Sequence, residues 1–274
     1  MADTDPLGEA QAFEEFWALQ ADPIFRGEGL PQGDGARVLV IPGLLANDFY
    51  LMTMHTWLNR IGYQPITSDI LWNVGCPKRL MGSIADKLSG LLSKDDSPIH
   101  LVGHSRGGLL AKAIAHQFPE TTRSLTIVGS PLAGMLYAGP EGLNAFASFM
   151  EQDNTVRQFV FNAGRSLTRL VDPNCDSPTC GCEYYDALFA PVADHIPVTS
   201  IYSVSDIVVP APSSHLAFGT NIQVDGTHSG LMFNREVYPH VAKALAAPCR
   251  HPTRLIECAA LSNSQGFESY VPFV

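Results

Sequence analysis

Short apolar runs alternate along the chain with longer segments in which apolar residues recur at helical spacing. The predicted strands lie at residues 37–41, 64–67, 99–102, 124–128, 198–202 and 221–224. The helical spacing is found at residues 9–20, 50–61, 79–93, 109–118 and 238–246. Strands that alternate with helices predict a mostly parallel sheet covered by helices on both faces, so the predicted fold class is α/β.

The alternation of strands and helices stops between residues 131 and 196. This segment is too long for an ordinary connection, and it has helical apolar patterns of its own at 143–150 and 155–161. We therefore predict that residues 131–196 form a helical cap or lid over the carboxyl edge of the sheet. The core is then built from residues 1–130 and 197–274.

The composition is that of an ordinary globular protein, because 46% of the 274 residues are hydrophobic and only 16% are charged. Lys and Arg number 17 against 27 Asp and Glu, and an acidic surface repels phosphate, so a nucleic-acid partner is excluded. No apolar run approaches the roughly 18 residues of a membrane span. Because Met1 to Pro6 is acidic and polar, without the pattern of a signal peptide, the cytoplasm is the expected location unless a leader was removed from a secreted protein.

The six cysteines leave the thiol state open, and they are Cys76, Cys175, Cys180, Cys182, Cys249 and Cys258. A zinc site needs four ligands at suitable spacing, and there is no C-x-x-C pair, so no metal is expected. Disulfides in the loop 175–182 or between Cys249 and Cys258 would favour an oxidising compartment, and free cytosolic thiols are the alternative. The tail 250–274 has no clear period and is expected to pack on the domain or to join a homo-oligomer.

The sequence Gly103-His104-Ser105-Arg106-Gly107 fits the pattern G-x-S-x-G, with an apolar strand before it and an Ala-rich helix after it. In this setting the serine sits on a sharp, strained turn, and the two glycines let strand and helix approach closely. The amino-terminal amides of the helix favour negative charge that develops beside the serine. The pattern therefore predicts that Ser105 is a nucleophile, and a plain strand–helix turn with a surface serine is the alternative.

A nucleophilic serine needs a base and an acid that orients the base, and these are expected later in the chain, the acid before the histidine. Asp206 directly follows the strand 198–202, at the carboxyl edge of the sheet, and is the predicted acid. His228 lies in a Gly-flanked loop after the last strand and is the predicted base. The alternatives are a turn carboxylate and a solvent-facing histidine, while His104, His215 and Asp225 have less suitable settings.

The charged intermediate of acyl transfer needs two backbone amides as an oxyanion hole. The amide of Arg106, next to the nucleophile, and that of Leu44, in the loop after the strand 37–41, are the predicted donors. The Arg106 side chain is expected either to meet an anionic group of the substrate or to form an ion pair on the surface. Candidates for the substrate pocket are Leu45, His104, Met135 and Leu136, although the apolar residues of the cap could equally bury its own core.

Four stretches of the chain resemble serine α/β-hydrolases of the lipase and esterase type, in particular a bacterial group, and they lie at residues 38–47, 102–108, 197–203 with Asp206, and 228–231. The resemblance implies an α/β-hydrolase fold, with Ser105, Asp206 and His228 as nucleophile, acid and base. It also implies hydrolysis of a small-molecule or lipid-like carboxylic ester without metal or organic cofactor. Acyl transfer, hydrolysis of an amide, lactone or polyester, and a binding module with a vestigial triad remain the alternatives.

Overall fold

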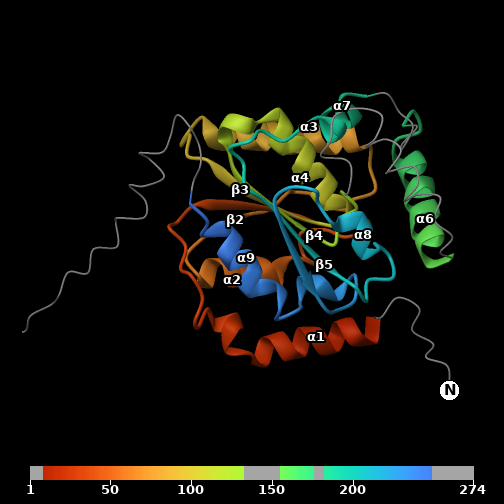
Figure 1. Cartoon of the computed structure of the whole chain (residues 1–274). Helices are drawn as coiled ribbons and strands as arrows, with labels where there is room; N and C mark the ends of the chain where they lie inside the picture. The colour runs from red at the N-terminus through yellow and green to blue at the C-terminus, as the bar shows by residue number, and fades with distance from the viewer. Residues whose placement is uncertain (1–8, 133–154, 176–181, 249–274) are drawn as a thin grey trace, which may run out of the picture.

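A six-stranded sheet forms the centre of the computed structural model, which describes residues 9–132, 155–175 and 182–248 (Figure 1). All five strand pairs are parallel, which confirms the predicted α/β class. The strands, in their order across the sheet, are β2 (Gln64–Ile66), β1 (Arg37–Ile41), β3 (Ile99–His104), β4 (Thr122–Val128), β5 (Val198–Ser203) and β6 (Thr220–Val224).

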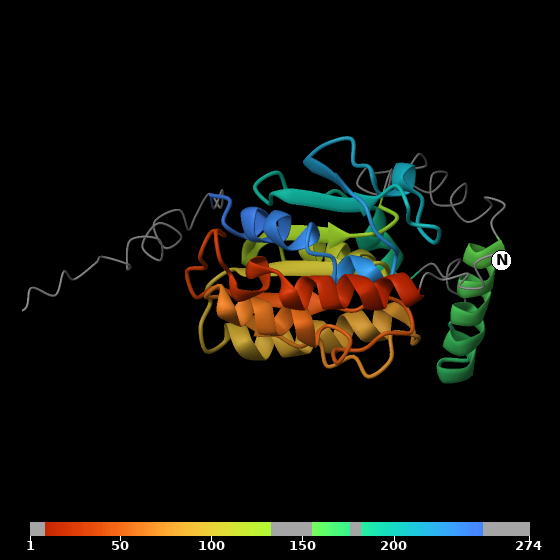
Figure 2. The ribbon, with the colours of Figure 1, turned by 90° about the horizontal axis from the view of Figure 1, so that it is seen from below.

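Helices cover both faces of the sheet (Figures 1 and 2). The helices of one face are α3 (Pro77–Leu92), α4 (Arg106–Gln117) and α7 (Glu183–Phe189). Those of the other face are α1 (Glu9–Ala21), α2 (Met52–Arg60) and α9 (Val237–Leu245). Side chains of a strand point alternately to the two faces, so Leu39 and Ile41 enter the first core, whereas Val38 and Val40 enter the second.

The largest difference from the predicted elements lies around the G-x-S-x-G pattern. The strand predicted to end at Val102 continues as β3 to His104, and the helix predicted from Leu109 begins as α4 at Arg106. Strand and helix are therefore separated by Ser105 alone. Glycines weaken both sequence signals, and the register with β4, in which Gly103 faces Ile127 and His104 faces Val128, keeps the strand extended.

The segment predicted to form a cap contains two described helices, α6 (Thr155–Val171) and α7. α6 lies at one end of the sheet, and the Thr168 hydroxyl donates a hydrogen bond to the Val74 carbonyl (Figure 1). α7, which the sequence did not predict, packs beside α4 through buried Tyr184 and Leu188. The predicted helix 143–150 lies outside the described residues, and the division into core and cap stays a prediction.

A buried lysine joins α7 to the helix behind the nucleophile. Lys112 of α4 is fully buried and donates hydrogen bonds to the carbonyls of Ala187, at 2.8 Å, and Ala190, at the carboxyl end of α7. Burial lowers the pKa of this ammonium to about 7. Lys112 thus donates to carbonyl groups at the carboxyl end of α7, where the last carbonyls of a helix lack partners within it.

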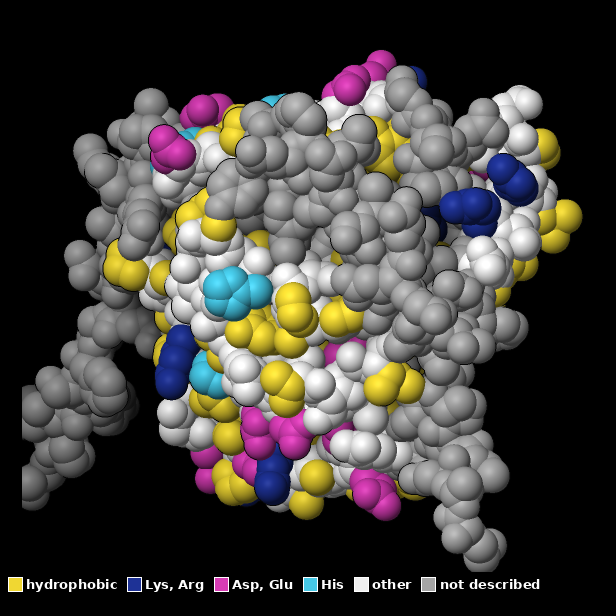
Figure 3. All heavy atoms as spheres, turned by 45° about the vertical axis from the view of Figure 1, so that its right-hand side comes forward, with side chains coloured by type: hydrophobic (Ala, Val, Ile, Leu, Met, Phe, Trp, Pro, Cys, Tyr) yellow, Lys and Arg dark blue, Asp and Glu magenta, His cyan; other side chains and the backbone are white. Residues whose placement is uncertain are grey.

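The surface combines an acidic balance with exposed apolar side chains. Figure 3, which brings the side of α6 and a short helix, α8 (Ala211–Ser214), toward the viewer, shows hydrophobic side chains lying open between polar ones. Exposed large apolar residues beside the loops after β1 and β2 are Leu45, Phe49, Met52, Leu71 and Trp72. Among the described helices none is both long enough and apolar enough to cross a membrane.

Candidate active site

Ser105 occupies the tight turn between β3 and α4, with φ 53° and ψ −123°. A positive φ is uncommon for a residue other than glycine, and it marks strain at this position. A Cβ on Gly103 would lie 2.5 Å from the Gly107 carbonyl oxygen, and one on Gly107 would lie 2.5 Å from the Pro42 oxygen. The absence of side chains at these two positions therefore lets strand, helix and loop approach closely, which confirms the role predicted for the glycines.

Substitution of Gly107 tests this packing. We expect Gly107→Ala to lower the free energy of unfolding by about 3 kcal/mol, because the new methyl group would overlap the backbone of residues 41 and 42. The matched control is Gly82→Ala in α3, where a Cβ meets no atom within 4 Å. This control should raise the free energy of unfolding by about 0.5–1 kcal/mol. Urea denaturation measures both, and equal values for the two variants would contradict the close approach at Gly107.

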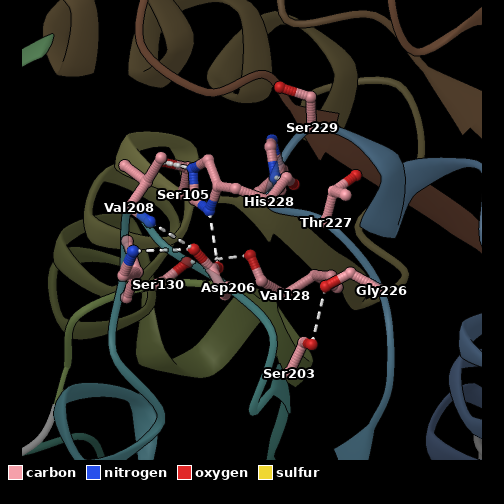
Figure 4. A network of polar contacts seen from close by, with 12 residues as sticks. Ser105, Val128, Ser130, Ser203, Asp206, Val208, Gly226, Thr227, His228 and Ser229 are labelled. Carbon is pink, nitrogen blue, oxygen red and sulfur yellow. Dashed lines mark hydrogen bonds and ion pairs between the residues drawn. The ribbon is translucent and has the colours of Figure 1, made fainter. Parts of the chain in front are cut away.

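His228 connects the nucleophile to a buried carboxylate (Figure 4). Its Nε2 lies 3.0 Å from the Ser105 Oγ, and its Nδ1 lies 2.7 Å from Oδ2 of Asp206. The Asp206 side chain is only 1% exposed, and its other oxygen, Oδ1, accepts hydrogen bonds from the amides of Val208 and Val209 at 2.8 and 2.7 Å. The structure thus brings the three predicted residues into one hydrogen-bonded chain, in the geometry that activates a serine.

The loop that carries His228 is supported by the histidine next to the nucleophile. The Nε2 atom of His104 lies 3.0 Å from the carbonyl oxygen of His228, and the two rings lie 5.0 Å apart. Burial and the neighbouring His228 lower the pKa of His104 to about 3, so its ring is neutral and Nε2 carries the donated hydrogen. The place of His104 in a substrate pocket stays a prediction, and the hydrogen bond gives it a structural role as well.

A carboxylate from the amino-terminal helix also holds this loop. Glu15 of α1 accepts hydrogen bonds from the amide and the hydroxyl of Thr227, at 3.1 and 3.2 Å. Burial raises the pKa of Glu15. The Tyr50 hydroxyl adds a hydrogen bond to the carbonyl of Ser229. Sequence analysis missed Glu15 because its partner lies 212 positions away and no motif links them.

The loop after β1, with the predicted oxyanion donor Leu44, lies against the nucleophile. A Cβ on Gly43 would be 3.1 Å from the Ser105 Cβ, which leaves no room for a side chain there. Within the described part of the chain the Leu44 amide donates no hydrogen bond to the backbone. Leu45 has a positive φ of 64° and is 38% exposed. The loop thus lies against Ser105, while the oxyanion role of Leu44 and Arg106 stays a prediction.

The prediction that the Arg106 side chain forms an ion pair on the surface is wrong, as far as the described residues are concerned. Its guanidinium donates to the Asn73 carbonyl at 2.7 Å, to the Asn73 Oδ1 at 2.9 Å and to the Gly75 carbonyl at 2.7 Å. It forms no ion pair with any carboxylate that the structure describes. Burial lowers the pKa of Arg106. Neutral backbone and amide oxygens therefore take the place of the expected counter-ion.

The remaining candidates lie apart from this chain of hydrogen bonds or outside the described residues. His215 packs its ring 6.1 Å from that of Tyr202, and Asp225 accepts hydrogen bonds from Ser205 and the Gly226 amide. The thiols of Cys76 and Cys182 are free, and no described group of three or more His, Cys, Asp or Glu could hold a metal ion. The candidates outside the described residues are Met135, Leu136, Cys180, Cys249 and Cys258.

Comparison with known proteins shows which solved structures share this fold. No protein-family model and no curated protein matches the sequence, whereas solved structures do. An α/β superfamily hydrolase of Oenococcus oeni PSU-1 is 15% identical, with a TM-score of 0.51, over 78% of this chain and 94% of that chain. A monoacylglycerol lipase of Paleococcus ferrophilus is 15% identical, with a TM-score of 0.48, over 78% and 97%. The first likeness shows that this chain has the fold of the α/β-hydrolase superfamily.

Proposed function

We propose that this protein is a serine hydrolase that cleaves carboxylic esters with an apolar acyl or alcohol group. The observation that carries the proposal is the continuous chain of hydrogen bonds from Asp206 through His228 to Ser105, on a turn with positive φ. A vestigial triad in a binding module has no reason to keep a buried carboxylate, a base and a strained serine in register. The fold supports the proposal, because α/β-hydrolases place a nucleophile on this turn.

The proposed reaction begins when the Ser105 Oγ attacks the ester carbonyl carbon while His228 Nε2 accepts the hydroxyl proton. Asp206 holds the Nδ1–H tautomer and stabilises the imidazolium. The amides of Leu44 and Arg106 donate to the oxygen that becomes negative. When the intermediate collapses, the bond to the alcohol oxygen breaks, and His228 returns the proton to the leaving alcohol. A water molecule, deprotonated by His228, then attacks the acyl carbon; the bond from that carbon to the Ser105 Oγ breaks, His228 returns the proton to Oγ, and the acid is released.

Apolar side chains near the proposed oxyanion loop favour an apolar substrate. Leu45 is 38% exposed, and the neighbouring loop after β2 has Leu71 and Trp72 at 81% and 62% exposed. The two loops are joined by the hydrogen bond from the Leu45 amide to the Asn73 carbonyl, at 3.4 Å. Apolar surface in contact with a substrate chain gains about 25 cal/mol per Å² removed from water. These residues therefore support a preference for apolar groups over charged ones.

Hydrolysis of p-nitrophenyl esters with acyl chains from about two to about sixteen carbons tests this proposal, because each CH₂ that is buried adds about 0.8 kcal/mol. We expect release of p-nitrophenol with an optimum above acetate, since longer chains bury more apolar surface. A matched anionic substrate, the p-nitrophenyl hemisuccinate, should react more slowly than the butyrate. Absence of hydrolysis across the whole series, together with no reaction of Ser105 with a fluorophosphonate, would favour the binding module. Faster product formation with an added alcohol than with water alone would favour the acyltransferase.

A further inference from the structure

Asn73 is fully buried and connects the two ends of the proposed oxyanion loop. Its side-chain Nδ2 donates to the Pro42 carbonyl at 2.7 Å, at the start of the loop. Its backbone amide donates to the Ala46 carbonyl at 3.0 Å, and its carbonyl accepts from the Leu45 amide at 3.4 Å. Leu44 lies between these attachment points, so the position of its amide follows from the position of Asn73.

Asn73 is held in turn by the residue that follows the nucleophile. Arg106 donates to both the carbonyl and the Oδ1 of Asn73, so its guanidinium fixes the direction of the side-chain amide that reaches Pro42. A third hydrogen bond, to the Gly75 carbonyl, holds the chain just beyond Asn73. The planar guanidinium suits this task because its donors point along fixed directions in one plane.

We propose that Asn73 and the Arg106 side chain are positioning residues that set the distance between the two amides of the oxyanion hole. This proposal rests on the function proposed above. Arg106 supplies one amide from the start of α4, and through Asn73 its side chain fixes the loop that supplies the other, at Leu44. In this proposal both side chains act through hydrogen bonds to the loop and not through contact with the substrate. The two halves of the hole, which lie on separate elements, are thereby held as one unit.

The physical reason for such a link is the precision that oxyanion stabilisation needs. A donor must lie about 2.7–3.1 Å from the charged oxygen, and a displacement of about 1 Å costs on the order of a hundredfold in rate. The loop cannot be fixed by a side chain at Gly43, since a Cβ there would lie 2.9 Å from the His104 Nδ1. Asn73 supplies support through its hydrogen bonds to Pro42, Leu45 and Ala46.

Three variants test the positioning pair: Asn73→Ala, Arg106→Met and the double variant. We expect kcat for p-nitrophenyl butyrate to fall about 100-fold in Asn73→Ala and about 10- to 100-fold in Arg106→Met, with KM changed less than about threefold. Inhibition by an alkyl boronic acid, which forms a charged tetrahedral adduct, should weaken in proportion to kcat. The kcat of the double variant should lie within about twofold of the kcat of the slower single variant, because both substitutions disrupt the same hydrogen-bonded unit.

The values of kcat, KM and boronic acid affinity distinguish a positioning role of Asn73 and Arg106 from a role in the stability of the fold. Arg26→Met, which removes an exposed guanidinium paired with Glu28, should leave kcat and KM unchanged. A rise in KM at constant kcat, or losses that multiply in the double variant, would overturn the proposal. So would a loss of boronic acid affinity that does not follow kcat.

Buried Asn73 could be needed for folding, so circular dichroism and the melting temperature accompany each variant. If Asn73→Ala does not fold, Arg106→Lys decides, since it keeps the positive charge and loses the planar set of donors. An unchanged kcat in a folded Arg106→Lys would overturn the proposal, and a fall of about tenfold or more would support it. Failure of the proposed function looks different, because the wild type itself would then hydrolyse no ester and Ser105 would not react with a fluorophosphonate.

Discussion

Replacement of Ser105 with alanine is expected to lower kcat for ester hydrolysis by at least about 10⁴-fold. The hydroxyl 3.0 Å from His228 Nε2 is the group that forms the acyl-enzyme, and no other described hydroxyl is hydrogen-bonded to that nitrogen. What activity remains would come from water held beside His228 and from the oxyanion amides. Initial rates at known enzyme concentration and saturating p-nitrophenyl butyrate measure the loss in kcat.

The free energy of unfolding of Ser105→Ala shows whether a loss of activity comes from a loss of folded protein. The substitution removes one hydroxyl and keeps the Cβ, so the free energy of unfolding should change by no more than about 1 kcal/mol. A variant that is folded and inactive locates the chemistry at Ser105. Retention of more than a tenth of the wild-type rate, roughly the level at which only about 1.4 kcal/mol of transition-state stabilisation is lost, would contradict the nucleophile assignment.

Asp206→Asn is expected to lower kcat by about 10⁴-fold, because it changes the tautomer of His228. Oδ1 of Asp206 accepts two backbone hydrogen bonds, from Val208 and Val209, so an asparagine would keep its oxygen there and turn its NH₂ toward Nδ1. Nδ1 must then accept a hydrogen bond, which moves the ring proton to Nε2. With Nε2 protonated, His228 cannot take the proton of Ser105.

The matched control for this prediction is Asp225→Asn in the loop before His228. Asp225 is also a loop carboxylate and accepts hydrogen bonds from Ser205 and from the Gly226 amide, but it makes none to His228. We expect its replacement to change kcat less than about threefold. Comparable losses in the two variants would show that the Asp206 effect arises from the loop and not from the tautomer.

The core of the fold could be predicted from the sequence because parallel strands are buried on both faces. Val38 to Ile41 is a continuous apolar run, and Ile99 to Val102 is apolar except for His100; such segments locate strands without knowledge of the partner. Element ends were less predictable, since α4 begins at Arg106 among glycines that carry no helical signal. The helix α7 was missed because its burial depends on contact with α4, which local spacing does not encode.

The proposed triad was accessible to prediction because each member follows a strand, so local patterns indicate the shared edge of the sheet. The supporting residues were not accessible. Asn73 and Glu15 act on segments 31 and 212 positions away, and neither belongs to a motif. The Arg106 side chain was misjudged because a charged residue suggests a charged partner, whereas buried carbonyl oxygens can satisfy a guanidinium equally well.

The measurement that tests the central claim most directly is the site and rate of modification by a fluorophosphonate, followed by mass spectrometry. The wild type should gain one phosphonyl group, located in the peptide that contains Ser105. Ser105→Ala should gain none, and Asp206→Asn should react far more slowly, because the serine attacks only when His228 accepts its proton. An unmodified wild type, or a label on another residue that persists in Ser105→Ala, would contradict the claim that Ser105 is the activated nucleophile of this protein.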